Sequence, residues 1–337
     1  MRSVSCALAL CGLWLVGCDS DRRPPAASSP ASATSAAVAA PGSAAQQGSS
    51  AEEDRAAFAL PAVPKLIALG DLHGDLAATR AALKLAGAID DQDHWVGGTL
   101  TVVQNGDQID RGDQDRAILE LFERLADEAR AAGGAVHALN GNHELMNAQG
   151  DLRYVTEGAM KDFEGVGGLD LRNPRLASMP QVGRARAAAF LPGGPYARKI
   201  ADRKVILMVG DTVFAHAGVL PTHVRYGIGK MNRETAAWLE GQSASPPAAV
   251  LAEDGPVWTR RYGSKELGAD DCEVLGRALD GMGAKRMVVG HTVQKEGITS
   301  GCDGRVWRVD VGMSAYYGGK PAVLEIAGEA VKAVKGD

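Results

Sequence analysis

The stretch that decides the fold runs from Thr99 to Gly112 and reads TLTVVQNGDQIDRG. Its first part is a short run of apolar and β-branched residues, which is typical of a buried strand. A Gly turn follows, and Asp107, Asp110 and Arg111 come directly after it. Open α/β sheets bind ligands at the carboxyl ends of their strands. The stretch therefore predicts a strand that delivers charged side chains to a ligand site.

The same order of strand, Gly turn and polar residue occurs on both sides of this stretch. Residues 65–69 lead to Asp71, and residues 135–139 lead to Asn142. Successive polar residues are about 35 positions apart, the length of one strand–helix–strand unit. We therefore expect an α/β fold with successive crossovers of a parallel sheet. Helical patterns fill the gaps at residues 76–86 and 114–132.

The second half of the chain has a less regular pattern. Residues 151–200 are rich in Gly, Arg and Pro and predict an insertion that packs over the active edge. Its arginines either shape a substrate entrance or form a solvated, neutral surface. Beyond the insertion the strand pattern is more antiparallel. The expected strands are a hairpin at 204–209 and 212–215, single strands at 286–289 and 306–311, and a hairpin at 322–327 and 330–334.

Segments rich in His, Asp, Asn and Gly follow the predicted strands. They are residues 70–74, 106–112, 141–144, 216–218 and 290–292. Each alone has an ordinary explanation, such as a turn, a helix cap or a buried histidine. Together they favour a metal centre, because carboxylates and imidazoles bind zinc, iron and manganese. Two cations bridged by one carboxylate can clamp the attacking and leaving oxygens of a displacement.

These ordered segments resemble the calcineurin-like metallophosphoesterases and, within them, the phosphoprotein phosphatase superfamily. The run from Gly141 to Asn147, continued by residues 150–151 and 153–155, is similar to the Shewanella-like phosphatases. The resemblance covers about residues 64–327. It implies an α/β sandwich of two mixed sheets flanked by helices, with the active site at the C-terminal ends of the strands.

The resemblance also implies a role for each polar residue. His143 would protonate the leaving-group oxygen, with Asp110 orienting it. Arg111 would bind the substrate phosphate together with Arg260, or with Arg261 as the alternative. The implied cofactors are two divalent metal ions, with manganese expected and iron or zinc as alternatives. The implied metal ligands are Asp71, His73, Asp107 as the bridge, Asn142, His216 and His291.

The chain departs from the eukaryotic members of that superfamily in two places. Ala217 follows His216 where those members have a glycine, and the segment between His143 and His216 is longer. Their preference for phosphoserine and phosphothreonine is therefore not carried over. Tyr316 and Tyr317, beside two glycines, either line the pocket or serve packing.

The expected function is hydrolysis of phosphate monoesters, on phosphoserine, phosphothreonine or phosphotyrosine proteins. The expected nucleophile is a metal-bridging hydroxide that attacks directly, without a phosphoenzyme. One alternative is a hydrolase of nucleotides or other small phosphoesters in the envelope, and another is a lipoprotein that binds phosphate without turnover. A net charge of −5 argues against nucleic acid as a partner.

The N-terminus predicts export. Arg2 precedes an apolar stretch too short to span a bilayer, as in a secretory signal peptide at residues 1–18. Its end, Leu15-Val16-Gly17-Cys18, resembles a bacterial lipobox, with an ordinary signal peptide as the alternative. Residues 19–57 are rich in Ala, Ser and Pro and predict a disordered tether, and residues 58–337 form the expected phosphoesterase domain. We expect a location in the bacterial cell envelope, facing the periplasm or the exterior, with membrane contact only through the lipid on Cys18.

Two cysteines, Cys272 and Cys302, lie in the expected domain. A pair of cysteines in an exported chain favours a disulfide. Two separate thiols are the alternative, since sequence alone does not give their distance.

Overall fold

The computed structural model describes residues 52–336. The expected signal peptide, Cys18 and most of the expected tether lie outside the described residues. The end of that tether is part of the fold, because the Asp54 carboxylate accepts hydrogen bonds from the N–H groups of Gly229 and Lys230 at 3.1 and 2.9 Å. These residues begin helix α9 (Ile228–Leu239), so Asp54 caps that helix. The folded part therefore begins several residues before the expected boundary at residue 58.

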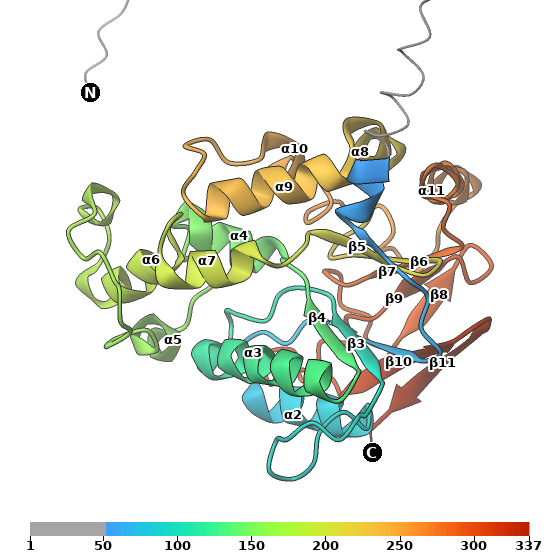
Figure 1. Ribbon diagram of the computed structural model, residues 1–337, viewed down its shortest axis with the longest axis horizontal. Coiled ribbons are helices and arrows are strands. Elements are labelled where there is room, and N and C mark those ends of the chain that lie inside the picture. The colour runs from blue at the N-terminus through green and yellow to red at the C-terminus, as the bar shows by residue number, and fades with distance from the viewer. Residues whose placement is uncertain (1–51, 337) are drawn as a thin grey trace, which may run out of the picture. The chain divides into compact units, whose positions relative to one another are not determined.

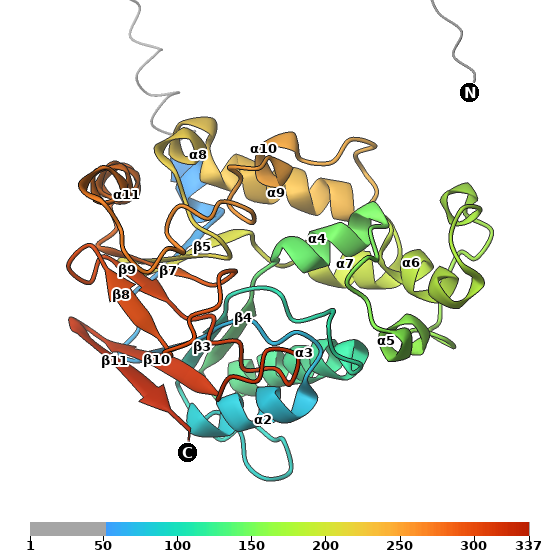
Figure 2. The same ribbon diagram turned by 180° about the vertical axis from the view of Figure 1, so that it is seen from behind.

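Two mixed β-sheets form the framework (Figures 1 and 2). The first sheet has five strands in the order β11-β10-β2-β3-β4. They are β2 (Leu66–Leu69), β3 (Thr101–Gln104), β4 (Ala135–Ala138), β10 (Ala322–Ala327) and β11 (Ala330–Lys335). Strands β2, β3 and β4 run parallel, as predicted. The predicted C-terminal hairpin, β10 and β11, joins them antiparallel to β2.

The second sheet has six strands in the order β1-β5-β6-β7-β9-β8. They are β1 (Ala59–Leu60), β5 (Ile206–Val209), β6 (Thr212–Ala215), β7 (Arg286–Val289), β8 (Thr299–Gly301) and β9 (Val306–Arg308). Strands β5 and β6 form the predicted hairpin. The second half is less antiparallel than its pattern suggested, because β6, β7 and β9 pair in parallel. The C-terminal ends of β6 and β7 consequently lie at the same edge.

Helices cover the outer faces of both sheets (Figures 1 and 2). Helices α2 (Leu76–Leu85) and α3 (Asp115–Ala131) pack on the first sheet, close to their predicted bounds. Helix α2 starts at Asp75, whose carboxylate accepts a hydrogen bond from the N–H of Ala78 at 2.9 Å. The helices on the second sheet are α8 (Pro221–Tyr226), α9, α10 (Ala248–Leu251) and α11 (Ala269–Met282).

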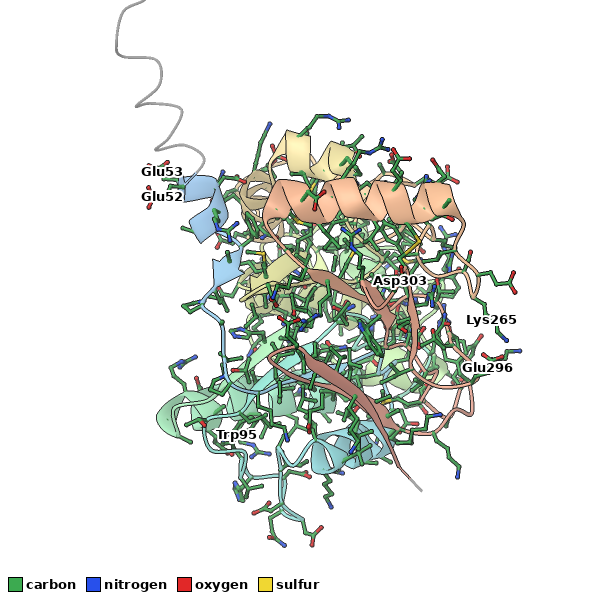
Figure 3. All side chains as sticks on the ribbon, turned by 90° about the vertical axis from the view of Figure 1, so that its right-hand side faces the viewer. Glu52, Glu53, Trp95, Lys265, Glu296 and Asp303 are labelled. Carbon is green, nitrogen blue, oxygen red and sulfur yellow. A yellow bond between two sulfur atoms is a disulfide. The ribbon has the colours of Figure 1, made fainter. Side chains whose placement is uncertain are left out.

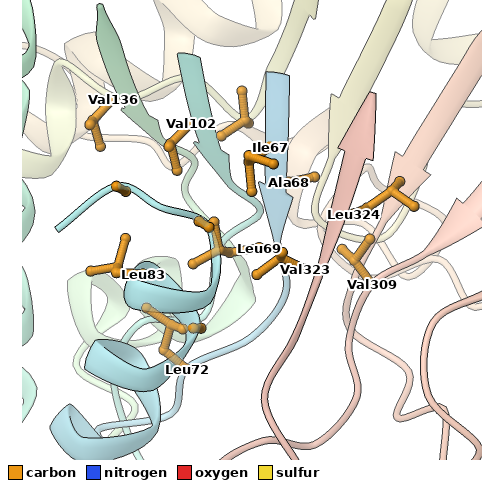
Figure 4. Packing of buried hydrophobic residues seen from close by; sticks show 14 of the residues in the cluster. Ile67, Ala68, Leu69, Leu72, Leu83, Val102, Val136, Val309, Val323 and Leu324 are labelled. Carbon is orange, nitrogen blue, oxygen red and sulfur yellow. The ribbon is translucent and has the colours of Figure 1, made fainter. Parts of the chain in front are cut away.

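One apolar cluster holds the first sheet to its helices and to the second sheet. Ile67, Val102 and Val136 come from the three parallel strands and pack with Leu83 of α2 (Figure 4). Val309, directly after β9, belongs to the same cluster, so the two sheets share an apolar interface. Burying each such side chain stabilises the fold by about 1.5–3 kcal/mol. The interface fixes the position of one set of strand ends against the other.

The insertion at residues 151–200 is helical and contains no strand. Its elements are α5 (Glu157–Lys161), η1 (Pro174–Leu176), η2 (Gln181–Gly183), α6 (Arg184–Phe190) and α7 (Pro195–Ala201). It follows helix α4 (Asn142–Gln149), and Figure 1 shows α5 and α6 on the side away from β8 and β11. Phe163, Phe190 and Tyr196 pack ring against ring with centroids 4.8, 5.0 and 5.8 Å apart. The insertion is therefore a packed element.

Cys272 of α11 and Cys302, in the turn between β8 and β9, form a disulfide with their Cα atoms 5.3 Å apart. Of the two alternatives for these cysteines, the structure has the bonded one. Figure 3 labels the next residue of that turn, Asp303, and shows Lys265 beside Glu296, an ion pair at 3.2 Å. Within residues 52–336, no helix is both long and apolar enough to cross a membrane.

Candidate active site

The C-terminal ends of five strands bring the predicted polar residues to one edge. Asp71, Asp107 and Asn142 follow β2, β3 and β4 of the first sheet, and His216 and His291 follow β6 and β7 of the second. Left-handed backbone is common in these loops, although it is rare outside glycine and concentrates at functional sites. The residues concerned, with φ between 47° and 70°, are His73, Asp107, Asp110, Arg111 and His291.

Four potential ligand atoms converge where the two sheets meet. His216 Nε2 lies 2.9 Å from Asn142 Oδ1, 3.1 Å from His291 Nδ1 and 3.2 Å from Asp107 Oδ2. His216 Nδ1 lies 2.9 Å from the carbonyl oxygen of Asn105, which can only accept a hydrogen bond. Its proton is therefore on Nδ1, and Nε2 is left for a ligand, as in most metal-binding histidines. This group holds the residues predicted for the second metal.

A second group of ligand atoms lies on the other side of Asp107. His73 Nε2 is 3.8 Å from Asp71 Oδ2 and 3.9 Å from Asp107 Oδ2, and His73 Nδ1 donates to the carbonyl oxygen of Ile109 at 3.3 Å. Asp107 Oδ2 thus faces both groups, as a bridging ligand must. His143 also borders this group, since its Nε2 lies 3.8 Å from Asp107 Oδ2.

The charge of this cluster fits divalent cations. Burial alone would lower the pKa of His216, but the charges of Asp107 and Asp71 outweigh it and raise that pKa to about 10. Burial and the neighbouring Asp310 raise the pKa of Asp71 well above its ordinary value. The buried carboxylates therefore require positive charge beside them. Imidazole nitrogens with carboxylate and amide oxygens suit manganese, iron and zinc.

Two glycines and a buried glutamate hold the carboxylates of Asp107 and Asp71 in place. The Glu144 carboxylate accepts hydrogen bonds from the N–H groups of Asp107, Gln108 and Gly141 at 2.9, 2.8 and 2.7 Å. A Cβ on Gly141 would lie 2.2 Å from Asp107 Oδ1, and one on Gly290 would lie 2.4 Å from Asp71 Oδ1. Only glycine permits these carboxylates to come so close to the backbone.

His143 and Asp110 form a buried pair beside the candidate metal ligands. His143 Nδ1 is 2.7 Å from Asp110 Oδ2, and His143 Nε2 faces the pocket, 3.4 Å from an Nη atom of Arg111. Burial alone would lower the pKa of His143, but Asp107 and the hydrogen bond that His143 donates to Asp110 raise it above its ordinary value. Burial alone would raise the pKa of Asp110, but His143 and Arg186 hold it below its ordinary value. The pair therefore favours an imidazolium that can donate a proton.

A pocket of about 280 Å³ opens over these groups, and Arg111 and Arg260 both line it. Arg111 Nε is buried and has no hydrogen-bond partner within residues 52–336. Arg260 donates to Thr292 Oγ1 at 3.4 Å, whereas Arg261 points to the first turn of α11 and forms ion pairs with Asp270 and Asp271. Of the two alternatives, the structure places Arg260 at the pocket.

Three tyrosines surround Arg111 at the mouth of the pocket. The rings of Tyr154, Tyr316 and Tyr317 lie with their centroids 5.0, 5.3 and 5.1 Å from its guanidinium carbon. All three side chains are exposed, and Tyr154 and Tyr317 line the pocket. The sequence left open whether Tyr317 lines the pocket or serves packing, and in the structure it lines the pocket.

Several residues at the site were not predicted from sequence. Tyr154 and Arg186 come from the insertion. Tyr154 stands in the motif at residues 153–155 and Arg186 is one of the insertion's arginines, but neither had an individual predicted role. Glu144 was part of a predicted motif but had no predicted role. Asp310, after β9, is buried, and burial raises its pKa to about 6. The sequence predicted a strand over residues 306–311, whereas β9 ends at Arg308, so Asp310 lies in the loop that follows the strand.

Comparison with known sequences identifies the family to which this fold and site belong. Residues 64–295 match the calcineurin-like phosphoesterase family. The chain therefore belongs to the calcineurin-like phosphoesterases. The resemblance inferred from the five motifs is confirmed, and so is the fold of two mixed sheets flanked by helices.

The chain is also similar to individual proteins of known family. The chain is 39% identical over 292 residues to Shewanella-like protein phosphatase 2 of Arabidopsis thaliana, covering 78% of this chain and 75% of that protein. It is 29% identical to Shewanella-like protein phosphatase 1 of Plasmodium berghei, covering 80% and 74%. A solved mutant of a cold-active protein tyrosine phosphatase superposes with a TM-score of 0.66 at 25% identity, covering 82% and 79%. The chain is a metal-dependent phosphatase.

Proposed function

We propose that the chain hydrolyses phosphate monoesters on proteins, with phosphotyrosine as the favoured substrate. The observation that carries the proposal is that Arg111, Arg260 and His143 Nε2 face one pocket above both ligand groups. A phosphoryl group bound there would contact two cationic side chains and a proton donor at once. These are the groups that transfer of a phosphoryl group to water requires.

The side chains divide the work of the reaction. Arg111 and Arg260 would bind the phosphate oxygens through forked N–H groups and stabilise their growing charge. The oxygen of a water forms a bond to phosphorus while the ester P–O bond breaks, and that water releases one proton to solvent, from which His143 regains its own after the reaction. The leaving oxygen takes the proton from His143 Nε2, giving inorganic phosphate and a phenol or alcohol. Asp110 would stabilise the imidazolium before the transfer.

We assign metal binding to the residues of the two ligand groups described above. They are Asp71, His73, Asp107, Asn142, His216 and His291. Two divalent ions held there would lower the pKa of a bound water and neutralise phosphate charge. Manganese is the proposed ion, with iron or zinc as alternatives, because the ligand atoms suit all three.

The preference for phosphotyrosine rests on the three rings around Arg111. A phenyl ester bound to Arg111 would place its own ring against Tyr154 or Tyr317, where aromatic pairs gain about 0.5–1.5 kcal/mol. The names of the relatives agree with a protein substrate, and that of the solved neighbour with phosphotyrosine. A serine phosphate has no ring to make this contact.

The proposed location is the bacterial cell envelope, with Cys18 as the lipid anchor. The pattern at residues 1–18 supports it, as does the disulfide between Cys272 and Cys302, since disulfides persist in oxidising compartments. Metabolic labelling with palmitate tests it, because Cys18→Ala should abolish the label.

Hydrolysis by metal-stripped protein, with and without added Mn²⁺, tests the proposed function. Phosphotyrosine, phosphoserine and phosphothreonine peptides are assayed beside nucleotides, with Asp107→Asn and His143→Asn as controls. We expect metal-dependent release of phosphate from peptides, fastest with phosphotyrosine and lost in both variants. Activity confined to nucleotides would favour a small-molecule hydrolase. Bound metal without any hydrolysis would favour a phosphate-binding lipoprotein.

A further inference from the structure

The insertion places a fully buried arginine behind the acid pair. Arg186 of α6 has no exposed surface, although arginine is rarely buried completely. The rings of Phe163 and Phe190 lie with their centroids 5.1 and 5.4 Å from its guanidinium carbon. A side chain fixed in this way has little freedom to move, so its hydrogen bonds have a defined direction.

Each nitrogen of the Arg186 guanidinium has a partner near Asp110. One Nη atom lies 2.8 Å from Asp110 Oδ1, and the other lies 2.7 Å from Asp115 Oδ2. Nε donates to Asn147 Oδ1 at 2.7 Å. Asn147 Nδ2 in turn donates to Asp110 Oδ1 at 3.0 Å. Arg186 therefore binds Asp110 directly and also through Asn147.

The backbone of Asp110 is held by the same network. Both carboxylate oxygens of Asp115 lie 3.1 Å from the Asp110 N–H, and the Asp110 φ is 70°. A non-glycine residue in that region costs about 1–3 kcal/mol and persists only where its surroundings over-determine it. With Oδ1 engaged by Arg186 and Asn147, Oδ2 is directed to His143 Nδ1.

We propose that Arg186 is a positioning residue for ester cleavage, which fixes the Asp110 carboxylate so that His143 Nε2 points at the leaving-group oxygen. The inference rests on the proposed function, because it assumes that His143 protonates the leaving group. It gives the insertion a part in the reaction although α6 itself does not line the pocket. Lysine could not replace this arginine, because a single ammonium cannot reach all three partners in a fixed fork.

Two esters with different leaving groups separate positioning from a purely structural role. The phenolate of 4-nitrophenyl phosphate leaves with little help from an acid, whereas that of phenyl phosphate needs a proton. We expect Arg186→Met to lower kcat for phenyl phosphate about tenfold more than kcat for 4-nitrophenyl phosphate, with KM little changed. Arg184→Met on the same helix is the matched control, since within residues 52–336 the Arg184 side chain donates only to the carbonyl oxygen of Met179. If Arg186→Met does not fold, Arg186→Lys carries the same test.

A double variant identifies the path of the effect. In an Asp110→Asn background, Arg186→Met should change the ratio of the two rates no further, because its effect passes through Asp110. The inference would be overturned if Arg186→Met lowered kcat equally for both esters. It would also be overturned if Arg186→Met changed the ratio of the two rates further in the Asp110→Asn background. The His143→Asn variant distinguishes a failure of the proposed acid role of His143 from a failure of the positioning role of Arg186. If it lowers both rates equally, the acid role and this inference both fail. If it alone alters the ratio, only the inference fails.

Discussion

Arg111 is held from two directions before any substrate binds. Its N–H donates to the carbonyl oxygen of Tyr154 at 3.0 Å, and its φ of 68° turns the side chain into the pocket. The three tyrosine rings then limit where the guanidinium can go. The side chain is thus ordered in advance, which lowers the entropy lost on binding a phosphate.

Arg111→Lys should therefore lower kcat/KM for phosphotyrosine peptide by about tenfold or more, because one ammonium cannot form the paired N–H contacts of a guanidinium. Steady-state kinetics with a phosphotyrosine peptide measures this. Arg153→Lys is the control, since in the described part of the chain the exposed Arg153 side chain pairs only with Asp151. Equal kinetics for Arg111→Lys and the wild type would show that Arg111 does not bind phosphate.

Sequence predicts single residues well only where a motif carries them. Asp107 and His143 stand in motifs after strands, so their convergence could be expected. Arg184 and Arg186 differ by two positions in one helix, and nothing local distinguishes them. Arg186 is buried because Asp110 and Asp115, some 70 residues earlier, lie opposite it. That information is in the tertiary structure and not in the local pattern.

At the scale of elements, strands that end at Gly turns were predicted more reliably than the short helices of the insertion. Short runs such as β2 and β3 are buried throughout, and a glycine follows each within two residues. The insertion has short helices of five to seven residues, too short for a clear helical period. Their existence depends on packing among Phe163, Phe190 and Tyr196.

Helix α8 is expected to make the stability depend on pH. Buried His223 accepts a hydrogen bond at Nδ1 from the N–H of Leu220, 3.0 Å away. Burial lowers its pKa below the ordinary value of 6.5, and Asp254 offsets this only in part. A lowered folded-state pKa means that stability is fully present above 6.5 and is lost as the pH falls below it.

The wild type should therefore lose thermal stability as the pH falls below 6.5, because the unfolded chain takes up a proton at His223 that the folded chain resists. His223→Asn should lose less over that range, because its Oδ1 can accept the same hydrogen bond without titrating. Melting curves by circular dichroism at several pH values measure this. Parallel losses in the two proteins would show that His223 does not contribute.

The disulfide should stabilise the element that leads into β7. Cys272 and Cys302 are 30 residues apart in sequence, and closing a loop of that size stabilises a fold by about 3–4 kcal/mol. Urea unfolding with a reductant should give a lower midpoint than unfolding without it. The double variant Cys272→Ala, Cys302→Ala should already have the lower midpoint and should not respond to reductant. Equal midpoints for the wild type in both conditions would contradict this.

At the scale of the whole molecule, bound metal should stabilise the packing of one sheet on the other. A ligand that binds only the folded state stabilises it by about 4 kcal/mol at 1,000 times its Kd. Chelation should therefore lower the melting temperature of the wild type. Asp107→Asn should melt at about the chelated wild-type temperature with or without chelator. An unchanged wild-type melting temperature, with metal loss verified by elemental analysis, would contradict this.

The ligand group around His216 belongs to neither sheet alone. Asp107 and Asn142 come from the first sheet, while His216 and His291 come from the second. It forms only after His216 has docked against Asn142 and Asp107, which lie 74 and 109 residues earlier, so a partly synthesised chain has no such group to load. The ions available where folding is completed, rather than where translation occurs, would then determine which metal this group acquires. Two cells that make the same chain but fold it in different ionic surroundings could hold enzymes of different metal content.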